Sequence, residues 1–110
     1  MRRSHTAVVE RNVTWTGTFA TEPYEAGWAS EAIFFVRTLE SAGLTTPPHA
    51  RVELSPDGAR WCNEGTTIEL APAPELSFVR LSHFGGWVRL AGELSPGVAL
   101  KVIVYLTLKE

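Results

Sequence analysis

The chain has little of what small disulfide-bonded, calcium-binding and membrane proteins depend on. Among its 110 residues Cys62 is the one cysteine, so no disulfide can form within the chain. Asp57 is its single aspartate, which excludes the aspartate-rich loops that bind calcium. The N-terminal arginines are not followed by the apolar stretch of a signal peptide, and no run is long enough to span a membrane. These absences predict a cytoplasmic protein, or a part of a virion or other assembly, with no membrane partner.

The patterns of common enzymes and nucleic-acid binders are also missing. The net charge of −2 opposes binding to nucleic acid, which usually requires a basic face. The histidines, His5, His49 and His83, do not have the short spacings of zinc ligands. Neither a glycine-rich phosphate loop nor a G-x-S-x-G motif is present. We therefore expect no catalytic residues, no metal and no cofactor. A small enzyme or cupin-like metal protein is a third hypothesis, which the scattered histidines oppose.

Two kinds of side chain could still carry chemistry. Cys62 follows Trp61 and has no local histidine or asparagine to activate it, so it is predicted to be a buried, inert thiol. Glu53, Glu64 and Glu69 lie on or near successive predicted strands and could bring two carboxylates together. Glutamates on the solvated face of a strand are far commoner, and we interpret these three in that way.

Alternation of apolar and polar residues predicts an all-β protein. The last strand shows it best, after a turn at Ser95-Pro96-Gly97, because its alternate residues are all leucine or valine: Leu100, Val102, Val104, Leu106 and Leu108. About eight short strands and no significant helix are expected, at residues 11–20, 31–40, 50–55, 59–63, 66–70, 76–82 and twice within 86–110. Segment 31–40 also tolerates a short helix, although its Ile-Phe-Phe-Val run favours a strand buried on both faces. The pattern predicts an antiparallel β-sandwich, jelly-roll-like, over residues 11–110, preceded by a flexible tail at residues 1–10.

A tight turn followed by a tryptophan occurs at residues 55–61, Ser-Pro-Asp-Gly-Ala-Arg-Trp. One interpretation is a turn whose tryptophan returns to the core, and the other is a ligand-binding rim that includes Asp57. Tyr24 and Trp28 lie in the predicted loop 21–30, where aromatic rings can stack on sugars, anchor a partner or fold back as a lid. The carbohydrate-binding hypothesis combines Tyr24, Trp28, Asp57 and Trp61 at one end of the sandwich.

The chain resembles two groups of known β-sandwich proteins over residues 50–108. The 55–61 hairpin, the strand at residues 87–90 and the strand at residues 99–102 are similar to the C-terminal half of discoidin-type and related carbohydrate-binding jelly rolls. The chain is shorter than those domains and lacks the cysteine pair common in them. A hairpin with Asp-Gly and tryptophan, an aromatic-Val-Arg strand and a long final strand also resemble small β-sandwich proteins of tailed bacteriophages. The phage-like resemblance implies a structural role and fits the length better.

Surplus apolar residues on faces expected to point outward favour association with other chains. Ile103 and Tyr105 lie on the outer face of the last strand, and Phe34 and Phe35 give bulk to both faces of another. Trp87 follows two glycines near His83 and Phe84, and shares a face with Arg89, a potential cation–π partner. Core or edge packing is the alternative for Trp87.

The leading hypothesis from the sequence is a non-enzymatic, homo-oligomeric structural module, phage-like or shell-associated. Its expected interface comprises Phe34, Phe35, Trp87, Ile103 and Tyr105. The expected partner is a second copy of the chain, within a larger protein assembly. The alternative is the carbohydrate-binding module.

Overall fold

A computed structural model describes residues 4–82, 84 and 86–110 of the chain. These residues form nine strands: β1 (Ser4–Trp15), β2 (Thr18–Ala20), β3 (Tyr24–Glu25), β4 (Glu31–Ala42), β5 (His49–Ser55), β6 (Cys62–Glu69), β7 (Leu76–Ser82), β8 (Trp87–Glu93) and β9 (Ala99–Lys109). The described part of the chain has no helix, and therefore none long and apolar enough to cross a membrane. The predicted all-β class is confirmed.

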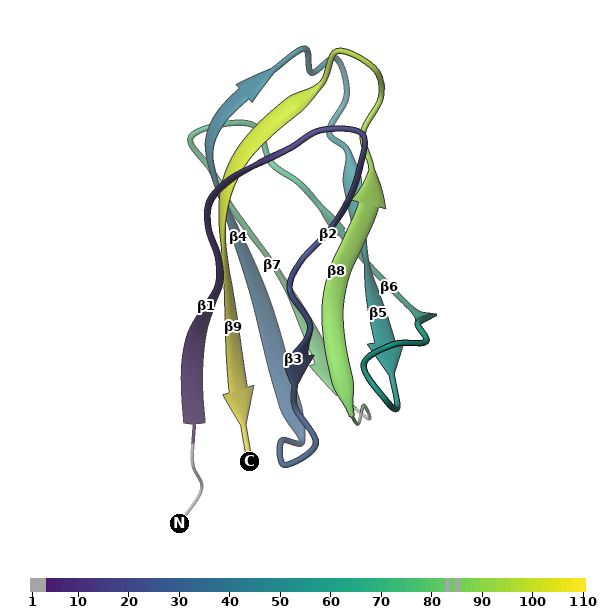
Figure 1. The fold of residues 1–110 in the computed structure, drawn as a ribbon. Coiled ribbons are helices and arrows are strands. Elements are labelled where there is room, and N and C mark those ends of the chain that lie inside the picture. The colour runs from purple at the N-terminus through teal and green to yellow at the C-terminus, as the bar shows by residue number, and fades with distance from the viewer. Residues whose placement is uncertain (1–3, 83, 85) are drawn as a thin grey trace.

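The strands form two antiparallel sheets packed face to face (Figure 1). One sheet has the order β1-β9-β4-β7, and the other has the order β2-β8-β5-β6, with β3 also paired to β8. Four sets of antiparallel pairs are nested in the sequence: β1 with β9, β2 and β3 with β8, β4 with β7, and β5 with β6. The pairings of β4 with β9 and of β5 with β8 join these pairs into the two sheets. This nesting of pairs, in which a long ribbon of strands folds over on itself, is the jelly-roll arrangement of a β-sandwich.

The core lies between the sheets and is formed by alternate residues of the long strands. On β9 five consecutive inward positions are completely buried: Leu100, Val102, Val104, Leu106 and Leu108. Phe34 and Val36 of the neighbouring strand β4 lie beside them, and Val52, Val88 and Leu90 pack against them from the second sheet. Alternation of this kind places one side of each strand in the core and leaves the other side for an outer face. The predicted inward face of the last strand is thus confirmed.

Segment 31–40 is a strand within β4, which settles the choice between strand and helix. Its residues pair with β9 on one side and β7 on the other. The expected burial on both faces is only partly found, because Phe34 is fully buried while Phe35 is half-buried. In place of the two strands predicted at residues 59–63 and 66–70 there is one, β6, which begins only at Cys62, because residues 59–61 belong to the turn. Its pairing with β5 has an irregularity between Arg51 and Glu53. The strand predicted at residues 76–82 is confirmed as β7.

The prediction of a flexible tail over residues 1–10 is wrong for residues 4–10, while residues 1–3 lie outside the described residues. Residues 4–10 belong to β1, which pairs with β9 from Ser4 opposite Lys109 to Trp15 opposite Leu100. Without β1 the apolar strand β9 would be an unpaired edge. The single strand expected at residues 11–20 is interrupted at Gly17, whose φ of 56° lets the chain cross to the other sheet. Trp15 and Phe19 stack in the core at this crossing, with ring centroids 4.1 Å apart.

Candidate functional site

The outer face of the four-stranded sheet carries a row of apolar side chains. Strand register places Val8 opposite Tyr105, Tyr105 opposite Phe35 and Phe35 opposite Phe78, so the row crosses all four strands. Three further apolar residues border the row on the same face: Ile33, Leu76 and Ile103. These seven residues are called the apolar face below. Such side chains are usually inside a protein, and a contiguous group of them on a surface typically marks an interaction site.

The side chains of the apolar face are accessible in the single chain. Four large apolar residues are exposed among the described residues, and three of them belong to this face: Val8 at 40%, Leu76 at 56% and Phe78 at 52%. The fourth, Trp28, is 38% exposed and lies in the loop between β3 and β4. The Phe35 and Phe78 rings are in contact, with centroids 6.1 Å apart. The row is therefore packed within itself and uncovered from outside.

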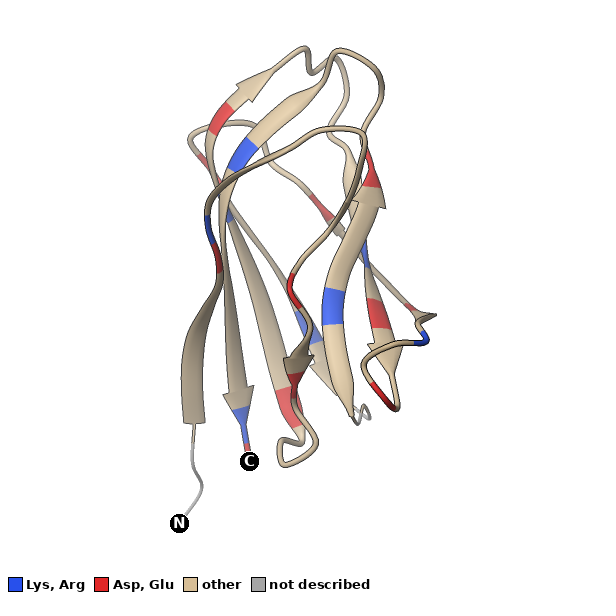
Figure 2. Cartoon of the chain, viewed as in Figure 1, with Lys and Arg blue, Asp and Glu red and all other residues tan. Residues whose placement is uncertain are grey.

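Charged residues lie at the two ends of this sheet face. Lys101 of β9 pairs with Glu40 of β4 at one end, with 3.5 Å between Nζ and Oε2. Lys109 of β9 stands opposite Glu31 of β4 at the other end. Figure 2 shows the long uncharged middle of β9 between these two basic positions. The sheet face thus has one lysine–glutamate pair at each end. Between the ends lies the apolar row, flanked by two exposed arginines, Arg37 of β4 and Arg80 of β7.

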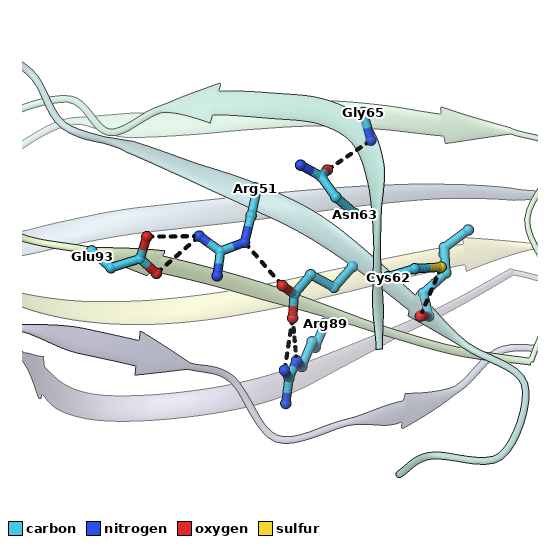
Figure 3. A network of polar contacts seen from close by, with 8 residues as sticks. Arg51, Cys62, Asn63, Gly65, Arg89 and Glu93 are labelled. Atoms are coloured by element: carbon cyan, nitrogen blue, oxygen red, sulfur yellow. Dashed lines mark hydrogen bonds and ion pairs between the residues drawn. The ribbon is translucent and has the colours of Figure 1, made fainter. Parts of the chain in front are cut away.

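The outer face of the five-stranded sheet is different, because its charges are satisfied within the chain (Figure 3). The Glu53 carboxylate accepts hydrogen bonds from Nε of Arg51 at 2.9 Å and Nε of Arg89 at 2.8 Å. Arg51 also donates to both carboxylate oxygens of Glu93, at 3.0 and 2.9 Å. The guanidinium of Arg89 lies 4.2 Å from the centre of the Trp61 ring. Two arginines and two glutamates thus balance one another across β5 and β8.

Glu53 is the most enclosed charged group of this network. The residue is 8% exposed, so its predicted place on a solvated strand face is wrong. Burial raises the pKa of Glu53, but the hydrogen bonds from Arg51 and Arg89 act in the opposite direction and prevail, so the pKa is lowered overall. The hydrogen bonds that Arg51 donates to Glu53 and Glu93 raise the pKa of Arg51. Both shifts favour the charged forms of Glu53 and Arg51, and the network holds the outer side chains of β5 and β8 in place.

The residues predicted as an interface fall into three groups. Phe35, Ile103 and Tyr105 share the apolar face. Phe34 cannot contribute to a surface, because it points into the core and is 0% exposed. Trp87 lies in the other sheet, between Glu25 and Ser55.

The surroundings of Trp87 also differ from the prediction. A Cβ at Gly58 would lie only 3.3 Å from the Trp87 ring, so the 55–61 turn covers it. Arg89 lies over Trp61 and not over Trp87, the cation–π partner expected from the sequence. Phe84 packs partly buried against the core, and His83 lies outside the described residues.

Residues of the predicted carbohydrate-binding rim already have contacts within the chain. Tyr24 packs against the core from β3, whereas Trp61 lies against Arg89 on the outer face of the five-stranded sheet. The Asp57 carboxylate is used by its own turn, because it accepts hydrogen bonds from the backbone N–H groups of Arg60 and Ala59 at 2.9 Å each. These bonds, together with one from the Ser55 hydroxyl, lower the pKa of Asp57 to about 2. Asp57 therefore stabilises the turn.

Cys62 and the acidic and histidine residues give no reactive cluster. Cys62 is exposed, which corrects the prediction of a buried thiol, and its Sγ lies 3.6 Å from the carbonyl oxygen of Leu54. Within the described residues, no group of three or more His, Cys, Asp or Glu side chains could hold a metal ion.

Four members of the apolar face were not singled out from the sequence. Val8 lies in the segment predicted to be a tail, and Ile33 lies in the strand predicted to be buried on both faces. Leu76 and Phe78 alternate with Val79 and Leu81, so the sequence shows that both sides of β7 are apolar. That two-sided pattern was the available signal, but it does not reveal which side faces the core. In the structure Leu81 is the buried one, at 5% exposure, and Phe78 is outside.

Comparison of the chain with known proteins finds no matching family model and no matching curated protein.

Proposed function

We propose that this chain is a non-enzymatic structural module that associates with copies of itself through the apolar face. The supporting observation is the row of Val8, Tyr105, Phe35 and Phe78, which crosses the whole four-stranded sheet on its outer side. Covering these side chains removes apolar surface from water, which is the main favourable contribution to most protein association. The hypothesis extends to a repeated unit of a larger shell or virion assembly, in agreement with the phage-like resemblance.

The contrast between the two outer faces supports this choice of surface. The face of the five-stranded sheet offers arginines and glutamates that already bind one another, so a partner would have to compete with satisfied ion pairs. The apolar face offers aromatic and aliphatic side chains, which are enriched at the centres of interfaces. The lysine–glutamate pairs of this face are at its ends, and the charges that association must desolvate between them are those of Arg37 and Arg80.

The size of the face sets the expected strength of association. Four strands about 4.8 Å apart, over the roughly 26 Å from Lys101 to Lys109, give a flat footprint of about 500 Å² per copy. Specific interfaces typically bury about 800 Å² of accessible surface per partner, so this one is at the small end. We expect a dissociation constant on the order of micromolar for one face-to-face contact.

The test is the native mass of the protein by light scattering, over a concentration series that spans the micromolar range. A variant with Ile103→Glu and Tyr105→Lys places two charges of opposite sign on the apolar face. A matched control with Thr67→Glu and Thr18→Lys places the same charges on exposed positions of the five-stranded sheet. Circular dichroism shows whether each variant keeps its strands.

The proposal expects a multimer for the wild type and the control, and the 12.1 kDa monomer for the folded Ile103/Tyr105 variant. A wild type that stays monomeric throughout the series would refute self-association. A folded Ile103/Tyr105 variant that keeps the wild-type mass would show that the interface lies elsewhere.

The carbohydrate-binding alternative has less support, because Tyr24, Asp57 and Trp61 are already engaged in contacts within the chain. It still makes a distinct prediction, since Trp28 and Trp61 would change their fluorescence with a binding glycan. A flat response across a glycan panel would count against it.

A further inference from the structure

We infer that two copies pack face to face about a two-fold axis that runs along the strands of the four-stranded sheet, so that both copies point in the same direction. This inference rests on the proposed self-association and specifies its geometry. The argument depends on the lysine–glutamate pairs at the two ends of β9 and β4, which are the two central strands of the sheet.

Two flat faces of identical chains can meet with their strands aligned in two symmetric ways. The two-fold axis lies between the faces in both, because a closed dimer uses the same patch on each copy. If the axis runs along the strands, it exchanges β9 with β4, so β9 of one copy lies over β4 of the other. If the axis runs across the strands, each strand lies over its own counterpart and the two ends of the sheet are exchanged.

The middle of the face does not distinguish these two arrangements, because its two arginines lie over uncharged residues in both. Arg37 and Arg80 lie over Ile103 and Thr6 of the second copy with the axis along the strands, and over Ile33 and Leu76 with the axis across them. With the axis along the strands, Tyr105 lies over Phe35 of the second copy, and Val8 lies over Phe78 of the second copy. With the axis across the strands, each of these residues lies over its own counterpart. Aromatic and aliphatic side chains can pack in either way, so the choice must come from the charged ends.

The charged ends favour the axis along the strands. Exchange of β9 with β4 places Lys101 over Glu40 of the second copy and Lys109 over Glu31 of the second copy. Each end then holds two lysines and two glutamates in alternation, an arrangement that extends the 3.5 Å Lys101–Glu40 pair already present in one chain.

The axis across the strands brings like charges together. Exchange of the two ends places Lys101 over Lys109 of the second copy and Glu40 over Glu31 of the second copy. Like charges set against each other across an interface suppress that arrangement. The lysine–glutamate pairs at the ends of β9 and β4 are thus complementary to themselves in only one of the two aligned packings.

A charge exchange at one end separates the two arrangements. The double variant Glu40→Lys with Lys101→Glu keeps the ion pair within each chain, so the folded monomer retains that contact. With the axis along the strands, two copies of the variant still complement each other, and the dissociation constant stays within about twofold of the wild type. A mixed dimer of variant and wild type then sets Lys over Lys and Glu over Glu, and is weaker on the order of tenfold. Fluorescence energy transfer between donor- and acceptor-labelled chains measures the dissociation constants of the wild-type dimer, the variant dimer and the mixed dimer.

A second readout uses the edge strands. Ser4 of β1 and Ser82 of β7 lie at the same end of the sheet, on opposite edges of one row. In a Cys62→Ser background, one chain carries Ser4→Cys and the other carries Ser82→Cys. With the axis along the strands, the two cysteines face each other and the mixture forms a cross-linked mixed dimer. With the axis across the strands, Ser4 faces the opposite end of the second copy, near Thr14, and a Ser4→Cys chain cross-links instead with a Thr14→Cys chain.

The outcomes separate this inference from the proposed function. An unchanged variant dimer, a weakened mixed dimer and the Ser4–Ser82 cross-link together support the axis along the strands. A variant dimer tighter than the wild type, or the Ser4–Thr14 cross-link, overturns that axis while self-association stands. If no pair of chains associates at any concentration, the proposed function fails and the inference fails with it.

Discussion

Truncation of Phe78 to alanine should weaken self-association far more than it weakens the fold. Phe78 lies on β7, the edge strand of the four-stranded sheet, and is 52% exposed. A phenylalanine side chain has about 200 Å² of accessible surface, so roughly 100 Å² of it is open to a partner. At about 25 cal/mol per Å², covering that area contributes about 2.5 kcal/mol, of which alanine would keep a small part. The loss is therefore about 2 kcal/mol per copy.

A symmetric dimer contains Phe78 twice, so the total loss is about 4 kcal/mol, close to a thousandfold in the dissociation constant. The monomer loses much less. Within one chain the Phe78 ring contacts Phe35 and lies 5.2 Å from the guanidinium of Arg80, and contacts of this exposed kind contribute about 1 kcal/mol. The variant should therefore lose most of its self-association while it keeps most of its stability as a monomer.

Sedimentation equilibrium over a concentration series gives the dissociation constant, and urea unfolding of dilute monomer gives the stability. Trp28→Ala is the matched control, because Trp28 is the exposed aromatic residue that lies in a loop away from the apolar face. The expected result is a large increase in the dissociation constant for Phe78→Ala and no change in it for Trp28→Ala. If Phe78→Ala leaves the dissociation constant within about threefold of the wild type, the assignment of the apolar face as the interface is refuted, since that shift is under 1 kcal/mol.

Two further predictions concern the other sheet and its turn. Glu53→Ala should lower the free energy of unfolding by about 1 to 3 kcal/mol, because it leaves the partly exposed Arg51 and Arg89 without their shared carboxylate. Urea unfolding checks this, and a loss no greater than that of Thr67→Ala would contradict the structural role of the network. The pKa of Asp57 is lowered from 3.8 to about 2, so its contribution to stability is present above the unfolded value and is lost as the pH falls through about 2. Carboxyl NMR shifts of Asp57 measure this titration, and a midpoint at the ordinary value would contradict the turn geometry.

The individual strands could be predicted because burial imposes a strict alternation on them. β9 is the best case, since five inward positions in a row are leucine or valine and all are completely buried. β7 was predicted with its correct bounds, because prolines precede it and apolar residues fill it. These features are local, so a short window of sequence contains them.

Partners distant in the sequence could not be predicted from such windows. Residues 4–10 of β1 read as a tail because their partner, β9, lies at the other end of the described chain. Glu53 resembled an ordinary solvated glutamate because Arg89, 36 residues away in sequence, lies on a strand that only the fold brings next to it. The same limit applies to the apolar face, since Val8, Phe35, Phe78 and Tyr105 meet through three separate strand pairings.

The central position of β9 has a consequence for the order of events during synthesis. β9 is the last described strand to leave the ribosome, yet it lies between β1 and β4 and supplies Ile103 and Tyr105 to the apolar face. Before β9 emerges, β1 has no neighbour and Val8 is not aligned with Phe35. Pairings over such sequence separations also form slowly. A nascent chain therefore lacks the complete surface for association, and self-association is delayed until the sandwich has closed.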